Sequence, residues 1–168
     1  MQRAPLLFAS LALSLTADAA VPPRIPNPQI DYKTYLRVSA EVEETRLQHR
    51  LTEEQFAAMA ADPGTVVLDA RSADKYRLLH LRGAVSLPFT DFTAEELARV
   101  IPSKDTRVLI YCNNNFLGDP RAFATKAAPA SLNINTYVSL AIYGYRNVYE
   151  LGPLLDVKTT RLQLERGD

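Results

Sequence analysis

Cys112 is the residue whose chemistry stands out in this sequence, because it is the only cysteine among 168 residues. It follows an apolar, branched run at 108–111 that is typical of a buried strand. Asp119 and Pro120 predict the N-cap and first turn of a helix. A strand, a polar loop and a helix in succession place the thiol at the carboxyl end of a strand, where open α/β sheets hold their sites. Because a thiolate is a nucleophile, we predict a catalytic thiol at Cys112.

The residues between this cysteine and the predicted helix form a candidate anion-binding loop. Backbone N–H groups of such a loop, together with a helix N-terminus, favour negative charge, including that of a thiolate. Asparagine tolerates left-handed backbone geometry and its amide donates hydrogen bonds, although ordinary turn chemistry also explains an asparagine run. The candidate loop residues are Asn113, Asn114, Asn115, Phe116, Leu117 and Gly118. Arg121 is the nearest cation downstream and a further candidate anion contact, with a solvated helix position as its alternative.

The composition limits which other kinds of chemistry are expected. Lys plus Arg and Asp plus Glu each number 19, and no basic tract is present. Nothing therefore predicts binding to nucleic acid or to an anionic membrane surface. With 47% hydrophobic residues, the chain is long enough for one domain with a sizeable core. Cysteine and histidine are not clustered, so we expect no metal site and no cofactor.

Residues 1–20 have the pattern of a signal peptide. Arg3 supplies a positive start, and an apolar run follows at 6–15. We predict cleavage after Ala19 or Ala20 and export to the periplasm or the medium, with no stable membrane insertion afterwards. A retained membrane anchor is the alternative, although the run is short for a span. In an oxidising compartment, a lone thiol either packs as a small apolar residue or has a chemical role.

Apolar runs alternate with amphipathic segments along the rest of the chain, which is typical of an α/β fold. Residues 21–51 are expected to hold a proline-rich linker, an extra helix at 31–44 and an edge strand at 45–51. Further strands are predicted at 65–71, 108–111 and 147–151, and a short strand is predicted between a turn at Gly83 and Pro88. Capping boxes at 52–55 and 93–96 each predict the start of a helix. Further helices are predicted at 72–79, 120–128 and 136–143, and the last two are joined by a polar connection at 131–135. We therefore predict a central, mostly parallel sheet of about five strands with helices on both faces.

Several of these segments together resemble the rhodanese-like domain family. The matching segments are Leu68-Asp69-Ala70-Arg71, Tyr76, His80, Gly83-Ala84 with Leu87-Pro88, Leu109-Ile110-Tyr111-Cys112, and Gly144 to Leu151. Their order covers residues 52–152 and leaves 153–168 as a C-terminal strand or tail. The resemblance implies a rhodanese-like α/β fold and sulfurtransferase activity. Sulfane sulfur would pass from a small-molecule donor, through a persulfide on Cys112, to a thiol or another thiophilic acceptor, and the resemblance names no protein partner.

The same resemblance makes Asp69 and Arg71 candidate supporting residues. Arg71 would lie near the site and Asp69 would hold loop backbone, while a structural ion pair at a strand end is the alternative. His80 matches a family position that is structural. The stretch from Cys112 to Asp119 is longer than the usual family loop and holds no Arg or Lys. Because thiosulfate is a dianion, this loop predicts weak thiosulfate binding.

Three other functions remain open from the sequence. A rhodanese-like binding or scaffolding module in the cell envelope, without catalysis, is the main alternative, because the loop lacks its basic residue. Phosphatase action would need an arginine six positions after Cys112, and Gly118 stands there. Redox sensing through a sulfenic acid would need an external thiol, because the chain has no second cysteine.

Overall fold

The computed structural model describes residues 25–167 and divides the chain into two units, Met1–Ile30 and Asp31–Asp168. The predicted signal peptide at 1–20 lies outside the described residues. In the described part of the first unit, the Ile30 amide donates to the Asn27 carbonyl. All helices and strands of the described part belong to the second unit. None of the helices between residues 25 and 167 is both long enough and apolar enough to cross a membrane.

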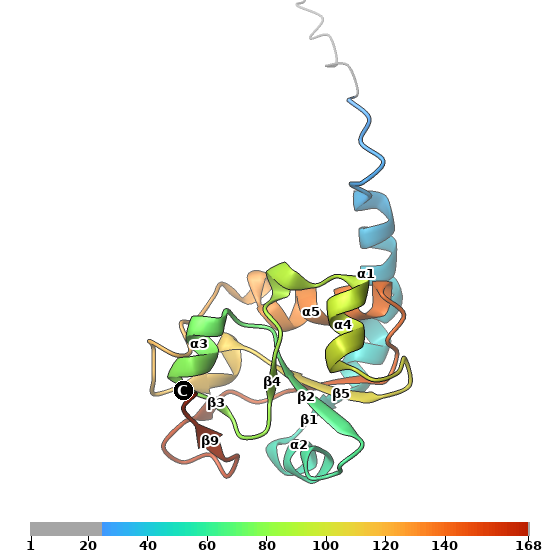
Figure 1. The fold of residues 1–168 in the computed structure, drawn as a ribbon. Coiled ribbons are helices and arrows are strands. Elements are labelled where there is room, and N and C mark those ends of the chain that lie inside the picture. Colours follow the sequence, from blue (N-terminus) through green and yellow to red (C-terminus); the bar gives the residue numbers. More distant parts are fainter. Residues whose placement is uncertain (1–24, 168) are drawn as a thin grey trace, which may run out of the picture. The chain divides into compact units, whose positions relative to one another are not determined.

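A five-stranded parallel sheet forms the centre of the second unit, with the order β1-β7-β5-β2-β4 (Figure 1). The strands are β1 (Arg50–Leu51), β2 (Thr65–Asp69), β4 (Val85–Ser86), β5 (Arg107–Tyr111) and β7 (Val148–Leu151). Strand β5 lies in the middle and pairs with β2 in register from Thr65↔Arg107 to Asp69↔Tyr111. The predicted α/β fold with a parallel sheet of about five strands is confirmed.

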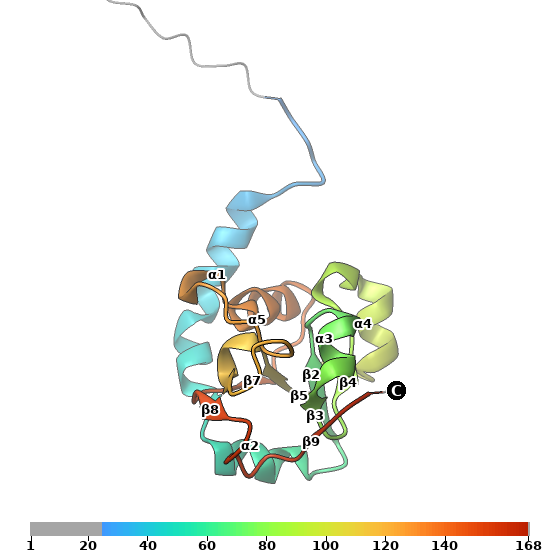
Figure 2. The same cartoon turned by 90° about the vertical axis from the view of Figure 1, so that its left-hand side faces the viewer.

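Side chains of β5 alternate between two hydrophobic cores, one on each face of the sheet. Val108 and Ile110 pack into the core formed with α1 (Tyr32–Gln48), α4 (Ala94–Val100) and α5 (Leu132–Ile142). Leu109 and Tyr111 pack into the opposite core, which includes Phe56 of α2 (Glu53–Ala60) and residues beside α3 (Ala73–Leu78). Figure 2 shows α1, α4 and α5 on one side of the sheet and α2 on the other. A strand with both faces covered reads as a continuous apolar run, as at 108–111.

The two predicted capping boxes differ in the structure. Thr52 and Gln55 form both reciprocal hydrogen bonds at the start of α2. At the start of α4, the Thr93 hydroxyl accepts from the Glu96 amide, but the Glu96 carboxylate pairs with Arg99 instead of returning to the cap. Helix starts were thus predictable from these patterns, whereas the reciprocal bond depends on which cation lies one turn later.

The expected helix at 31–44 is longer, which corrects the predicted strand at 45–51. Helix α1 continues to Gln48 because no breaking residue interrupts it and Val38 and Val42 pack into the core shared with α5. Strand β1 is therefore only Arg50–Leu51, paired in parallel with β7. This extension carries Arg46 to the edge of the sheet.

The predicted helix at 120–128 is wrong, and so is the polar connection at 131–135. Asp119 caps a single turn, its Oδ1 accepting from the amides of Arg121 and Ala122. The Ala122 carbonyl accepts from Arg71, and the Lys126 amide and carbonyl pair with the Asn114 side chain. These tertiary contacts use the backbone groups that a helix would need. Helix α5 begins at Leu132, within the predicted connection.

Two small strand pairs fix the segments around the sheet. Strand β3 (His80–Leu81) pairs antiparallel with β9 (Leu164–Glu165), which lies in the segment expected to be a strand or a tail. Strand β6 (Phe116–Leu117) pairs in parallel with β8 (Leu155–Asp156), and neither was predicted.

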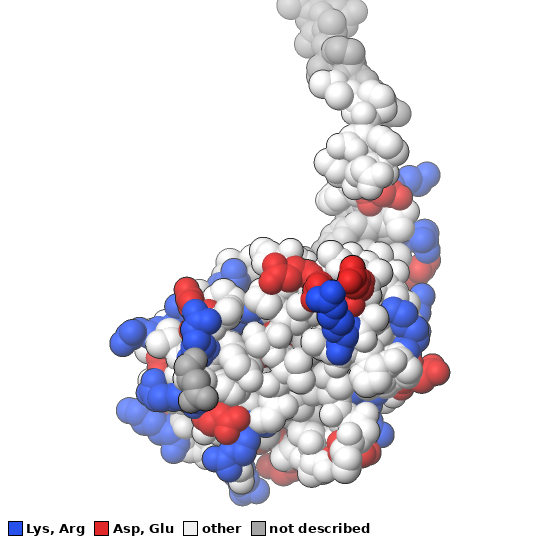
Figure 3. All heavy atoms as spheres, in the orientation of Figure 1, with Lys and Arg blue, Asp and Glu red and all other residues white. Residues whose placement is uncertain are grey.

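Charged side chains of both signs border the face drawn in Figure 3, whose centre is largely uncharged.

Candidate functional site

Cys112 follows β5, the central strand, and stands at its carboxyl end as predicted. The residue is 1% exposed, but its sulfur lies among polar groups. Sγ accepts from the Asn114 amide at 3.4 Å and lies 3.5 Å from the hydroxyl of Ser131, the N-cap residue of α5. A thiol held between an amide donor and a hydroxyl differs from a cysteine packed among hydrocarbon side chains, because both groups can hydrogen-bond to a thiolate.

The segment after Cys112 is a short 3-10 turn at Asn113–Asn115, followed by β6, and not an open loop leading into a helix. The Asn115 amide donates to the Cys112 carbonyl, and the Phe116 amide donates to the Asn113 carbonyl. Within this turn, the Asn114 amide is the donor that points to the sulfur. The sequence predicted that several loop amides would face one anion. The structure has instead a turn that satisfies most of its own backbone groups.

Asn115 connects the cysteine segment to both neighbouring elements. Its Oδ1 accepts from the Cys112 amide at 2.9 Å and from Asn133 Nδ2 at 3.1 Å. Its Nδ2 donates to the Leu151 carbonyl at 2.8 Å and to the Pro153 carbonyl at 3.2 Å. This buried side chain uses all four of its hydrogen-bonding positions. Asn115 therefore fixes the position of Cys112 relative to α5 and to the end of β7.

The other predicted loop residues face different surroundings. Asn113 is buried and lines a separate cavity of about 470 Å³ beside Arg71, whose wall does not include Cys112. Phe116 packs in the core against Phe123, with ring centroids 4.7 Å apart. Leu117 is half exposed. The predicted loop from Asn113 to Gly118 thus does not converge on one anion.

Gly118 permits the turn after β6. Its φ of +91° lies in the region that favours glycine. A Cβ atom at this position would lie 2.8 Å from Asp156 Oδ1 and 2.9 Å from Val157 Cγ2. The glycine is therefore explained by backbone conformation and by close approach to the segment at β8.

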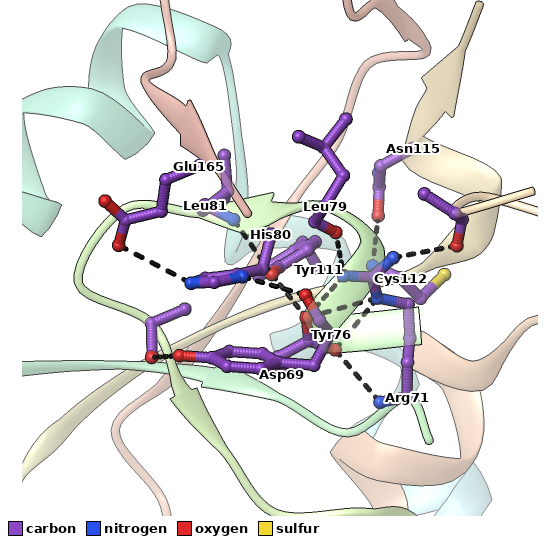
Figure 4. Close-up of polar contacts among 12 residues, drawn as sticks. Asp69, Arg71, Tyr76, Leu79, His80, Leu81, Tyr111, Cys112, Asn115 and Glu165 are labelled. Atoms are coloured by element: carbon purple, nitrogen blue, oxygen red, sulfur yellow. Dashed lines mark hydrogen bonds and ion pairs between the residues drawn. The ribbon is translucent and has the colours of Figure 1, made fainter. Parts of the chain in front are cut away.

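Asp69 and Arg71 form a buried ion pair at the end of β2, drawn with its neighbours in Figure 4. Arg71 donates from Nε and Nη2 to the Asp69 carboxylate, from Nη1 to the Ala122 carbonyl and from Nη2 to the Leu79 carbonyl. Burial acts to lower the pKa of Arg71, but the Asp69 carboxylate and Tyr111 raise it above its usual value. Burial, and then the Asp69 charge, raises the pKa of Tyr111 well above its usual value. This geometry agrees with the structural alternative for the pair.

The remaining sequence candidates lie away from the sulfur. His80 stacks on Tyr76 at 3.7 Å between ring centroids, and its ring nitrogens face the Tyr76 carbonyl and the Glu165 carboxylate. Arg121 is exposed in the turn after Asp119 and does not line the cavity that Cys112 borders. Neither residue contributes a charge at the thiol.

Cys112 borders a cavity of about 290 Å³ on the β7 side of the central strand. Its wall is built from the end of α1, from β1, from the end of β7, from the cysteine turn and from the start of α5. Arg46 and Arg50 stand on this wall together with Glu150. Sequence reasoning missed both arginines, because it sought a cation inside the cysteine loop. The signal available in the sequence was the group of charged residues from Arg37 to Arg46, to which we assigned no site.

Glu150 lies between the two arginines and is 1% exposed. Its Oε2 accepts from Arg46 Nη2 at 3.0 Å, and its Oε1 lies 3.1 Å from Arg50 Nε. Burial raises the pKa of Glu150, while the charges of Arg46 and Arg50 act in the opposite direction. Tyr137 of α5 also borders this group, and burial, followed by the Glu150 charge, raises the pKa of Tyr137 to about 12.

In the described part of the chain, no group of three or more His, Cys, Asp or Glu side chains could hold a metal ion.

Comparison with known proteins agrees with this architecture. The chain matches the Rhodanese-like domain family over residues 52–152, which is most of the second unit. The central parallel sheet with helices on both faces and a cysteine at the end of its middle strand defines an α/β domain of this class. The chain belongs to the rhodanese-like domain family. A search of curated proteins found no match.

Solved structures resemble the chain at low sequence identity. The rhodanese-like domain of an Anabaena protein has a TM-score of 0.50 and 17% identity, covering 70% of this chain and 79% of its own. Thiosulfate sulfurtransferase from Pseudomonas aeruginosa has a TM-score of 0.50 and 23% identity, covering 80% of this chain and 23% of its own. A Bacillus halodurans protein has a TM-score of 0.49 and 20% identity, covering 78% of this chain and 86% of its own. At these identities the likeness concerns the fold.

Proposed function

We propose that this protein is a sulfurtransferase that carries sulfane sulfur as a persulfide on Cys112. The observation that carries the proposal is the position of the chain's only cysteine at the end of the central strand, bordering a cavity and contacted by an amide and a hydroxyl. Membership of the rhodanese-like family supports the same reaction. The name of the Pseudomonas aeruginosa neighbour also points to sulfur transfer.

Two displacements at sulfur make up the proposed reaction. In the first, the Cys112 thiolate attacks the outer sulfur of a donor X–S⁻, forming Cys112–S–S⁻ and releasing X with the electron pair of the broken bond. In the second, an acceptor thiolate attacks the outer sulfur of the persulfide, forming R–S–S⁻ and regenerating the Cys112 thiolate. Sulfur atoms and negative charges balance in both steps, so neither step needs a metal or an external oxidant.

The chain's own groups have distinct tasks in this scheme. The Asn114 amide donates to Sγ and stabilises its negative charge before attack and after release. The Ser131 hydroxyl lies close enough to donate to the same sulfur. Asn115 holds the Cys112 backbone while the sulfur gains and loses an atom. We assign Asn115 a positioning role, because its side chain contacts the backbone of Cys112 and not the sulfur.

Thiocyanate formation from cyanide tests this proposal. The full chain is incubated with cyanide and, in turn, with thiosulfate, an aromatic thiosulfonate and an organic persulfide. We expect at least one donor to support turnover that Cys112→Ser abolishes, because serine cannot carry sulfane sulfur. If no donor supports turnover above the Cys112→Ser background, the sulfurtransferase proposal is wrong, and a binding module becomes the better description.

We also propose that the mature protein is exported. Support comes from the sequence pattern at 1–20, which the structure does not describe. N-terminal sequencing of protein recovered from the envelope fraction tests this directly. A mature N-terminus at Ala20 or Val21 is expected, and an intact Met1 in the cytosolic fraction contradicts export.

A further inference from the structure

Arg46 and Arg50 provide the cavity beside Cys112 with positive charge. Both residues precede residues 52–152, the range matched by the rhodanese-like family. Arg46 comes from the last turn of α1 and Arg50 from β1, and both border the same cavity as the thiol. The missing cation of the cysteine loop therefore has a counterpart that enters from the N-terminal helix and edge strand.

The charge balance in the cavity is positive. Two guanidinium groups, those of Arg46 and Arg50, face the single Glu150 carboxylate, which leaves one positive charge in excess. Arg50 keeps a half-exposed side chain and also donates from Nη2 to the Gly152 carbonyl. A cavity with this excess attracts a small anion, and planar guanidinium groups suit a carboxylate.

Three buried polar atoms of residues that border this cavity make no hydrogen bond within the described part of the chain: Asn133 Oδ1, Arg46 Nε and Glu150 Oε1, the last of which lies in the ion pairs with Arg46 and Arg50. Asn133 is 4% exposed and borders the cavity; its Nδ2 donates to Asn115, whereas its Oδ1 accepts no hydrogen bond. Arg46 Nε is buried and donates to no acceptor. Buried polar groups are nearly always paired, so Asn133 Oδ1 and Arg46 Nε can form hydrogen bonds with a polar molecule that enters the cavity.

We propose that this cavity binds the carboxylate of a small thiol or persulfide substrate through Arg46 and Arg50. In this arrangement Asn133 Oδ1 accepts an N–H or O–H of the same molecule, and the substrate sulfur faces Cys112. The inference rests on the proposed function for the sulfur chemistry, but the anion preference of the cavity does not. The expectation of weak thiosulfate binding considered the cysteine loop alone and did not include these two arginines.

Alkylation of Cys112 by a matched pair of reagents tests the anion preference without any sulfur transfer. Iodoacetate carries a carboxylate, and iodoacetamide has nearly the same size without charge. With either reagent the thiolate forms a carbon–sulfur bond and iodide leaves with the bonding electrons. The full chain has only one cysteine, so each rate constant reports on Cys112. The iodoacetate-to-iodoacetamide rate ratio is divided by that of free glutathione under the same conditions.

We expect the normalised ratio of the wild-type chain to be about 10, the effect of one charge-assisted hydrogen bond. Arg50→Gln should lower the ratio about threefold, since the half-exposed Arg50 is screened by solvent. Glu150→Gln should raise the ratio, because it removes the only carboxylate between the two arginines. Arg161→Gln is the matched control, because Arg161 is exposed and lies outside the cavity, and it should leave the ratio unchanged. Circular dichroism of each variant checks that it is folded.

Three results would overturn the inference. The first is a wild-type ratio equal to that of glutathione. The second is a ratio that Arg50→Gln and Glu150→Gln leave unchanged while both variants are folded. The third is a Cys112 that reacts with neither reagent until the chain is unfolded, since a small anion then does not reach the cavity. If no thiocyanate forms but the alkylation ratio is as predicted, the sulfurtransferase proposal is refuted and the anion site is still supported.

Discussion

Replacing Asn115 by alanine should destabilise the fold more than the same change at the adjacent Asn114. Asn115 makes four hydrogen bonds, to Cys112, Asn133, Leu151 and Pro153, and the first three of these are buried. Alanine removes all four and leaves their partners unpaired. The neighbouring side chain of Asn114 pairs only with the exposed backbone of Lys126, accepting from its amide and donating to its carbonyl.

The size of the effect follows from these contacts. Each buried group left without a partner costs about 1–3 kcal/mol, so three such groups cost about 3–9 kcal/mol. The cavity beside Asn115 lets water reach part of the gap, so we expect about 3–5 kcal/mol for Asn115→Ala. For Asn114→Ala we expect about 1 kcal/mol or less, because water replaces its partners.

Urea unfolding followed by circular dichroism measures both variants. Comparison of the two denaturation curves, with equal slopes, gives the difference in free energy of unfolding. If Asn115→Ala loses no more stability than Asn114→Ala, Asn115 is not the connection between Cys112, α5 and β7 that we describe. Asn115→Asp should be no milder than alanine, because it places a carboxylate oxygen against the carbonyls of Leu151 and Pro153.

Three further predictions concern the surroundings of the site. Arg71→Gln should lower the free energy of unfolding in urea by about 3–5 kcal/mol, because it leaves the buried Asp69 carboxylate unpaired. The alkylation ratio should not change, and a loss of under about 1 kcal/mol contradicts the structural role. Gly118→Ala should cost about 1–3 kcal/mol more than Gly83→Ala, since both have positive φ but only the first adds a clash; equal losses of stability contradict this. The alkylation ratio should rise as pH falls towards the pKa of Glu150, which burial raises above its usual value, because protonation removes the one carboxylate charge among the described residues that pairs with Arg46 and Arg50, while Tyr137 stays neutral. The thiolate fraction cancels in this ratio, and Glu150→Gln should make it independent of pH; a wild-type ratio that decreases as the pH is lowered refutes the charge assignment.

The parallel sheet could be predicted from the sequence because a strand buried on both faces leaves a clear apolar run. Leu109 and Ile110 belong to opposite cores, and no polar residue interrupts them. Helix boundaries were predictable where a local cap decides them, as at Thr52. They were not predictable at Asp119, because Arg71 and Asn114 capture the backbone groups that would have continued the helix.

The candidate site was predictable in its nucleophile and not in its surroundings. Local spacing places Cys112 at a strand end, but the partners of Asn115 lie 36 and 38 residues further along the chain. Arg46 borders the same cavity as the thiol only because α1 extends past its predicted end and β1 pairs with β7. Such contacts depend on how distant elements pack, and no local pattern in the sequence encodes them.

The central claim is that Cys112 carries sulfane sulfur, and the intact mass of the protein tests it most directly. The full chain is exposed to each sulfur donor, freed of excess reagent and weighed by mass spectrometry, with peptide mapping to locate any addition. We predict a gain of one sulfur atom on Cys112, which cyanide removes and which Cys112→Ser does not acquire. A wild-type chain whose mass no donor changes, or a serine variant that gains the same sulfur, would contradict the account.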